Sequence, residues 1–150
     1  MGQSVTIFCA QHWTVASFAP FFARIARSVG VGFTPHDRQL VLQEDPKYMS
    51  MMRLEEHEGD RAFAIEDCET NELLDPDFRQ HVAGLRFFRV SFHDVDVTRG
   101  LLRSFAVEAV AHGERAWFDT DYGWVIDAWH FLRELKKNPH WDWRFSKEDS

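Results

Sequence analysis

The stretch that decides the fold is "LRFFRVSFHDVDVTRGLLRSFAVEAVAHGERAWFDTDYGWVIDAWHFLRELKK", residues 85–137. It opens with "LRFFRVSFH", whose apolar and β-branched content predicts a strand. "DVTRGLLRSFAVEAVAHG" repeats apolar residues at helical spacing, so we expect a helix over Asp96–His112, with Asp96 as N-cap and Gly113 as its end. "ERAWFDTDYGWVI" predicts a hairpin that turns through residues 120–123.

A second helix, "DAWHFLRELKK", follows this hairpin, with Asp127 as its N-cap and Asn138-Pro139 as its stop. The order is therefore strand, helix, hairpin, helix.

The N-terminal half predicts the same order. The strand "SVTIFCA" precedes a helix over Ser17–Val29, two short strands surround a Pro-His-Asp turn, and a helix starts at Asp45. The helix starts Thr14 and Asp96 have the same separation along the chain as Asp45 and Asp127. This agreement favours two copies of one unit, residues 4–53 and 86–137.

We therefore expect a single α+β domain over residues 1–150, with a mostly antiparallel sheet and helices packed on it. A chain of 150 residues with 45% hydrophobic residues has enough apolar side chains for its own core. Between the two copies, "RAFAIE" is expected as an edge strand and Asp75-Pro76 as the start of a short helix. In the tail "NPHWDWRFSKEDS", Trp141 and Trp143 alternate with polar residues and are expected to pack against the protein's own body.

The net charge of the chain limits the classes of partner that we expect. Lys and Arg number 17 and Asp and Glu 24, a net charge of −7, so no basic surface for nucleic acid is expected. An acidic protein suits a cationic partner instead. No apolar span is long enough to cross a membrane and the N-terminus has no secretory signal, so we expect a cytoplasmic protein without membrane association. "MGQSVT" matches the short myristoylation pattern at Gly2, but no polybasic segment accompanies it.

No sequence motif for catalysis is present. The chain has no Gly-x-Ser-x-Gly elbow, phosphate-binding glycine loop or paired Cys and His at zinc spacing. Cys9 lies in an apolar run and is expected to be buried, and Cys68 stands among Glu66, Asp67 and Glu69, whose charges raise a thiol pKa. We expect no enzyme activity, no cofactor and no resident metal.

Four carboxylates follow the strands of the second half. Asp94 and Asp96 come after "FFRVSFH", and Asp119 and Asp121 lie at the end of the next strand and in its turn. If these strands are neighbours, the four side chains converge at one edge of the sheet. They then form helix caps and turns, an acidic binding patch, or a site for a hard divalent cation with His93 as base. The last alternative would make the protein a metal-dependent hydrolase or transferase.

The strand, the acidic and aromatic turn "WFDTDYGWVI" and the helix "DAWHFLREL" resemble the C-terminal part of small bacterial immunity proteins. Those proteins neutralise polymorphic toxins delivered between competing cells. The likeness covers residues 89–145 and extends to size and acidity. It implies a protein that binds a cognate toxin domain with a basic surface and occludes its active site or substrate groove.

On this interpretation the partner-binding residues are Asp94, Asp96, Asp119, Asp121, Tyr122 and Trp124. An oligomerising scaffold or adaptor is a third alternative, since 6 Trp and 14 Phe permit self-association.

Overall fold

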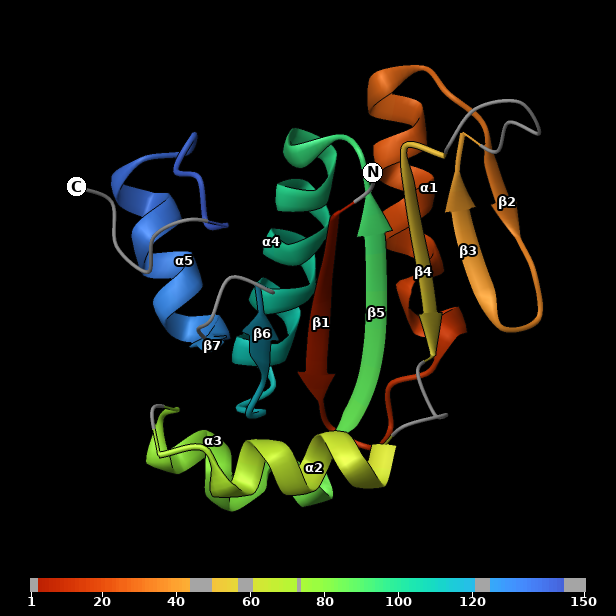
Figure 1. The fold of residues 1–150 in the computed structure, drawn as a ribbon. Helices are drawn as coiled ribbons and strands as arrows, with labels where there is room; N and C mark the ends of the chain where they lie inside the picture. The colour runs from red at the N-terminus through yellow and green to blue at the C-terminus, as the bar shows by residue number, and fades with distance from the viewer. Residues whose placement is uncertain (1–2, 44–49, 57–60, 73, 121–124, 145–150) are drawn as a thin grey trace.

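The computed structural model describes residues 3–43, 50–56, 61–72, 74–120 and 125–144, with only the backbone for residues 61–64. Within these residues the fold is α+β, as predicted: seven strands form one antiparallel sheet and five α-helices pack on it (Figure 1).

The strands are β1 Gln3–Cys9, β2 Phe33–Pro35, β3 Gln39–Leu42, β4 Met52–Glu56, β5 Arg86–Phe92, β6 Trp117–Asp119 and β7 Val125–Asp127. The helices are α1 Ala19–Val29, α2 Arg61–Thr70, α3 Pro76–His81, α4 Val95–Ala111 and α5 Ala128–Lys137, with 3-10 turns at Val15–Phe18 and Val82–Gly84.

The sheet has the order β2-β3-β4-β5-β1-β6-β7, with β1 and β5 at its centre. These two strands pair along their whole length, from Gln3 opposite Phe92 to Cys9 opposite Arg86. Each is followed by a helix, and the strands after that helix pair with the other central strand: β4 lies on β5, and β6 lies on β1. The two halves of the chain therefore interleave in one sheet.

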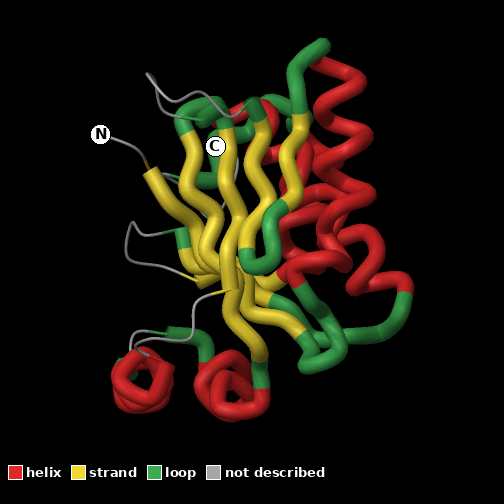
Figure 2. The backbone as a smooth tube through the Cα atoms, turned by 90° about the vertical axis from the view of Figure 1, so that its right-hand side faces the viewer, coloured by secondary structure: helices red, strands yellow, loops and turns green. Residues whose placement is uncertain are grey.

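The two faces of the sheet are covered differently. Helices α1, α4 and α5 lie on one face, whereas α2 and α3 lie across one end of the other face (Figure 2). Successive side chains of a strand point to opposite faces of the sheet, so each face has its own apolar side chains for helices to cover. In β1, Ile7 and Cys9 point into the larger core, and Phe8 between them packs against Phe78 of α3.

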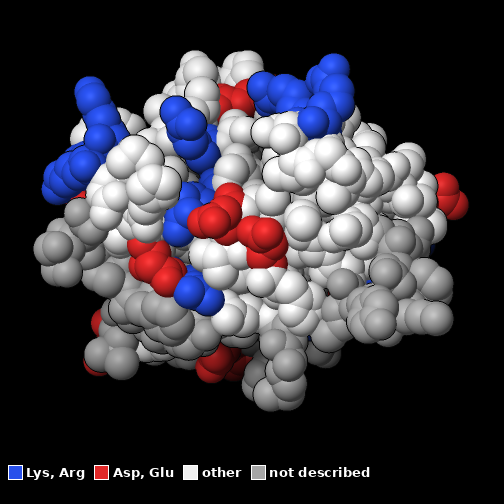
Figure 3. Space-filling model, turned by 90° about the horizontal axis from the view of Figure 1, so that it is seen from above, with Lys and Arg blue, Asp and Glu red and all other residues white. Residues whose placement is uncertain are grey.

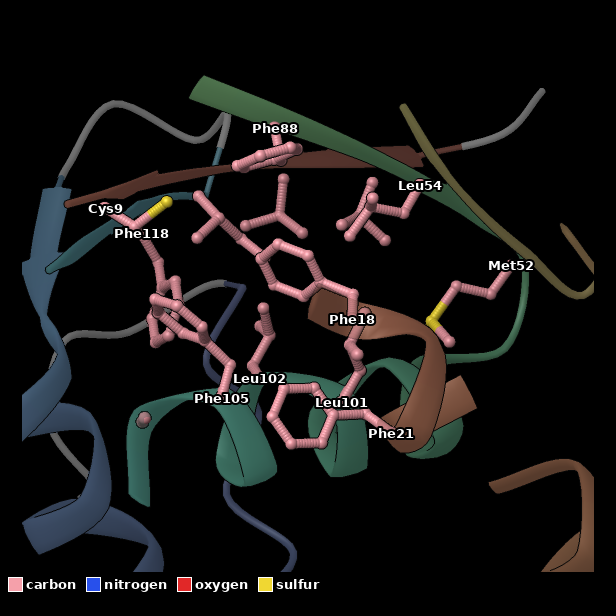
Figure 4. Packing of buried hydrophobic residues seen from close by; sticks show 14 of the residues in the cluster. Cys9, Phe18, Phe21, Met52, Leu54, Phe88, Leu101, Leu102, Phe105 and Phe118 are labelled. Atoms are coloured by element: carbon pink, nitrogen blue, oxygen red, sulfur yellow. The ribbon is translucent and has the colours of Figure 1, made fainter. Parts of the chain in front are cut away.

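Aromatic rings cross the larger core in a continuous series. Successive rings of this series are stacked, tilted or edge-to-face, with centroids 4.9–5.8 Å apart: Phe18, Phe105, Phe118, Phe131 and Trp141. Figure 4 shows Phe18 and Phe105 pointing into the space between the sheet and the helices. Full burial of each such ring contributes about 1.5–3 kcal/mol, so the series joins α1, α4, β6, α5 and the tail into one core.

The helix caps are largely as predicted. Thr14 and Ser17 form a capping box before α1, Gly30 ends that helix with φ 75°, and Asp127 accepts a hydrogen bond from the N–H of His130 at 2.8 Å. The cap of α4 was wrongly predicted. Asp94, not Asp96, accepts from the N–H groups of residues 96 and 97, at 3.0 and 3.1 Å. The reason is that the helix begins one residue earlier than expected, at residue 95.

Two other elements differ from the prediction. The prediction of a helix that starts at Asp45 is wrong for residues 52–56, which form strand β4. Residues 44–49 lie outside the described residues. Met52 and Leu54 are buried and Arg53 is exposed, the period of a strand, and β4 pairs with both β3 and β5. "RAFAIE" is helical in α2 instead of an edge strand, and Ile65 and Cys68 contact the smaller core at helical spacing.

The described part of the tail, up to Arg144, packs against the protein's own body, as expected for Trp141 and Trp143. Trp141 and Trp143 are buried in the larger core. The guanidinium of Arg99 donates to the backbone oxygen of Trp141 at 3.0 Å. Among the described residues, no helix combines the length and the apolar character needed to cross a membrane.

Candidate functional site

The structure does not bring the predicted carboxylates together. Asp94 and Asp96 lie at the start of α4, just beyond the end of β5. Asp119 lies opposite Thr6 on β1, whereas the last residue of β5 lies opposite Gln3. Three residues along β1 correspond to about 10 Å, and β1 also separates β5 from β6.

Asp119 also lies on the other face of the sheet. Thr6, its neighbour across the strands, shares a face with Phe8, which packs towards α3 and away from α4. Asp121, Tyr122 and Trp124 fall outside the described residues.

His93, Asp94 and Asp96 each make a different interaction. The N–H of His93 donates to the backbone oxygen of Met51 at 3.1 Å, and the carboxylate of Asp94 caps α4. Asp96 is exposed and forms an ion pair with Arg99 at 2.6 Å. Within the described ranges, no group of three or more His, Cys, Asp and Glu residues is placed to hold a metal ion. The carboxylates that the sequence singles out therefore form no metal-binding set in the described part of the chain.

A different group of carboxylates lies on α2 and in the segment that leads from α2 to the N-cap of α3. Glu66, Asp67, Glu69, Glu72 and Asp75 are all exposed, and among the described residues none of them forms an ion pair with Lys or Arg. We call these five residues the acidic surface. It lies at the end of the sheet where α2 and α3 cross (Figure 1).

Asp119 adds to the negative electrostatic potential near this acidic surface. Burial, followed by the charges of Asp119, Asp67 and Glu69, raises the pKa of the Cys68 thiol to about 11. Asp119 therefore lies close enough to α2 to act on its side chains. The predicted rise in the pKa of Cys68 is present, although burial contributes more to it than the neighbouring charges. Burial also raises the pKa of the Cys9 thiol, so neither thiol is a nucleophile at neutral pH.

An exposed aromatic side chain lies at the same end of the molecule. Trp129, the second residue of α5, is 60% exposed, more than any other large hydrophobic side chain of the described residues. It borders a pocket of about 370 Å³ lined by Asp77, Val110, Gly113, Glu114, Arg115, Ala116, Trp117, Asp127, Ala128 and Trp129. The buried Trp117 ring packs edge-on against Phe78 at 5.5 Å and holds α3 beside the pocket.

Three carboxylates, Asp77, Glu114 and Asp127, line this Trp129 pocket beside one cation, Arg115. Arg115 forms an ion pair with Asp77 at 2.5 Å, and Asp127 is engaged as the cap of α5. The pocket therefore joins a hydrophobic ring to a predominantly acidic rim.

Glu114 is held in place from the loop after β1. Trp13 donates its indole N–H to Glu114 at 2.8 Å, and the His12 ring lies 2.5 Å from the other carboxylate oxygen. Partial burial raises the pKa of Glu114, but these hydrogen bonds and the charges of His12 and His112 outweigh it, so the pKa is lowered. The carboxylate is thus ionised at neutral pH and fixes one wall of the pocket.

The exposure of Trp129 could have been found from the sequence. The inward positions of α5 are Ala128, Phe131 and Leu135, which recur at helical spacing. Trp129 lies off this stripe, so the helix turns it towards solvent. The aromatic residues predicted to bind the partner were instead Tyr122 and Trp124, in the turn.

The acidic surface and the Trp129 pocket have the chemistry of a protein-binding surface. Exposed tryptophan is enriched among the residues that dominate binding energy, and carboxylates around it suit a partner with Lys or Arg side chains. No protein-family model, curated protein or solved structure matches the chain.

Proposed function

We propose that this protein is an immunity protein that binds a cognate bacterial toxin domain and occludes its active site or substrate groove. Two things support the proposal: the resemblance of residues 89–145 to such proteins, and the exposed Trp129 beside an acidic rim. In this proposal the protein has no catalytic role and acts in the cytoplasm of the cell that it protects.

Trp129 is the observation that carries the proposal. A tryptophan left 60% exposed does nothing for the protein's own core, whereas its burial under a partner removes a large apolar surface from water. The guanidinium of Arg133 lies 5.3 Å from the centre of the Trp129 ring, so this ring accepts a cation. An Arg or Lys of a basic toxin can use the same interaction.

The acidic surface has a second role in this proposal. The five carboxylates of the acidic surface, which form no ion pair with Lys or Arg among the described residues, create a negative potential that accelerates the encounter with a basic toxin. Asp119 belongs to the same end of the molecule, so it stays in the proposed interface. Asp94 and Asp96 lie at the start of α4 and are left out of it, while Asp121, Tyr122 and Trp124 remain part of the original prediction.

The test uses the toxin domain encoded beside this gene and measures its affinity and association rate. Trp129→Ala is expected to weaken binding by roughly 2 kcal/mol or more, about thirtyfold, and to reduce protection in cells. Val29→Ala, at an exposed apolar position of α1, is the matched control and is expected to bind normally. Neutralising Glu66, Asp67 and Glu69 together is expected to slow association and to flatten its salt dependence.

Normal binding and protection by both the Trp129 variant and the triple variant would show that the toxin is bound elsewhere. A neighbouring gene whose product is not bound at all would remove the support for an immunity role.

A further inference from the structure

The helix layer has a second concave surface, which differs from the acidic surface in the charge of its residues. A groove of about 870 Å³ runs between α4 and α5, and a hollow of about 610 Å³ lies between α4 and α1. Gly100, Arg103 and Val107 of α4 line both, so the two hollows flank a single ridge. We call these two hollows and their ridge the α4 groove.

Cations outnumber carboxylates in the lining of the α4 groove: Arg24, Arg99, Arg103 and Lys136 against Asp96 and Glu108. Arg99 forms an ion pair with Asp96. Arg24, Arg103 and Lys136 are exposed, and in the described part of the chain none of them forms an ion pair. Figure 3, which views the molecule from above, shows several Lys and Arg side chains and a smaller number of Asp and Glu side chains on that end of the surface. In a chain with a net charge of −7, this local excess of cations among the described residues favours a negatively charged partner.

The middle of the ridge has no side chain. Gly100 lies inside α4, where glycine is less favourable than alanine, and a Cβ built there would meet no atom within 4 Å. Packing within this protein therefore does not require the glycine. It does allow another backbone to approach α4 closely. Val107, one turn further along the ridge beyond Arg103, is 51% exposed and offers an apolar contact.

We propose that the α4 groove binds an acidic amphipathic helix of a protein partner, which crosses α4 at Gly100. Its apolar face would meet Val107 and Leu132, and carboxylates on its two flanks would meet Arg24 on one side and Lys136 on the other. A helix is about 10 Å wide and can lie across the ridge with side chains in both hollows. A small ligand, in contrast, is usually enclosed in a single pocket. The inference does not depend on the toxin proposed above, since no residue that lines the α4 groove also lines the Trp129 pocket.

The probe is a labelled helical peptide of roughly 18 residues, about 27 Å long, with Leu and Ala on one face and Glu on both flanks. A matched peptide carries Lys in place of Glu. Binding is followed by fluorescence anisotropy at about 50 mM salt, where surface charges are weakly screened. We expect the acidic peptide to bind and the basic peptide not to bind.

Two double variants locate the site. Arg103→Gln/Lys136→Gln is expected to weaken binding at least about fivefold. Arg53→Gln/Arg89→Gln removes the same charge from exposed positions on β4 and β5 and is expected to change binding less than about twofold. Gly100→Leu, which has open space in the free protein, is expected to remain folded and to abolish binding. If Gly100→Leu does not fold, Gly100→Ala is the substitute and should weaken binding.

Several results would overturn the proposal. They are no binding of the acidic peptide, equal losses in the two double variants, or unchanged binding by the folded Gly100 variant. Tighter binding of single-stranded DNA than of the peptide, lost in Arg103→Gln/Lys136→Gln, would assign the groove to nucleic acid instead.

Discussion

Replacing Gly100 by alanine should make this protein more stable. Gly100 lies in the interior of the 17-residue helix α4, and a Cβ at this position meets no atom within 4 Å, so the added methyl group causes no clash. Alanine restricts the unfolded chain and raises helix propensity, together about 0.5–1 kcal/mol. For a chain of this size, that corresponds to an increase in Tm of roughly 2–4 °C.

The measurement is urea unfolding followed by tryptophan fluorescence. With a slope of about 2 kcal/mol per molar urea, the midpoint should rise by roughly 0.3–0.5 M at unchanged slope. Gly113→Ala is the matched control. Its Cβ also meets open space, but φ is 68°, so alanine there is strained and should lower the free energy of unfolding by about 1 kcal/mol or more. A destabilised Gly100→Ala, or two variants that shift in the same direction, would refute the reasoning.

The remaining predictions concern single side chains. Trp129→Ala should change the free energy of unfolding by less than about 0.5 kcal/mol because the ring is mostly exposed, whereas Trp143→Ala, in the core, should cost about 3–5 kcal/mol; denaturant melts of both compare them directly. The lowered pKa of Glu114 means that its carboxylate stabilises the fold above the unfolded pKa of about 4.3 and loses this contribution as pH falls through the folded value. The stability difference between wild type and Glu114→Gln should therefore shrink between pH 7 and pH 3, and a constant difference would contradict it. The pKa of Cys68 is raised from an ordinary value of 9.0 to about 11, so this thiol should hold on the order of 100-fold less thiolate at pH 7 than an unperturbed cysteine and react slowly with iodoacetamide until the protein unfolds.

The charge distribution changes how partners of this protein should be sought. In the part of the chain that the structure describes, the five carboxylates of the acidic surface, on α2 and before α3, form no ion pair with Lys or Arg, and neither Arg24, Arg103 nor Lys136, on α1, α4 and α5, forms one. A net charge of −7 conceals this separation, because it sums both surfaces. A basic partner and an acidic partner can therefore be bound on different faces of the same molecule.

Local features of the sequence determined the helices α1, α4 and α5 and the β6–β7 hairpin. Each depends on groups a few residues apart: Thr14 and Ser17 at one start, Asp127 at another, Gly30 and Gly113 at two ends. Hydrogen bonds inside a helix join residues four apart, so a periodic stretch with caps contains most of the information it needs.

Tertiary structure decided that residues 52–56 form a strand, and it decided which groups surround the charged side chains. An Asp-Pro start and helix-forming Met and Leu indicate a helix there, yet β3 and β5 supply hydrogen-bonding partners on both sides and make the segment a strand. β5 begins 30 residues after β4 ends, at Arg86 against Glu56, so no local pattern reveals the pairing that makes β4 an inner strand of the sheet. For the same reason Asp119 and Asp94, on neighbouring elements of the sequence, lie on opposite faces of the sheet. Strand order places a side chain beside its neighbours, and strand order is a property of the assembled sheet.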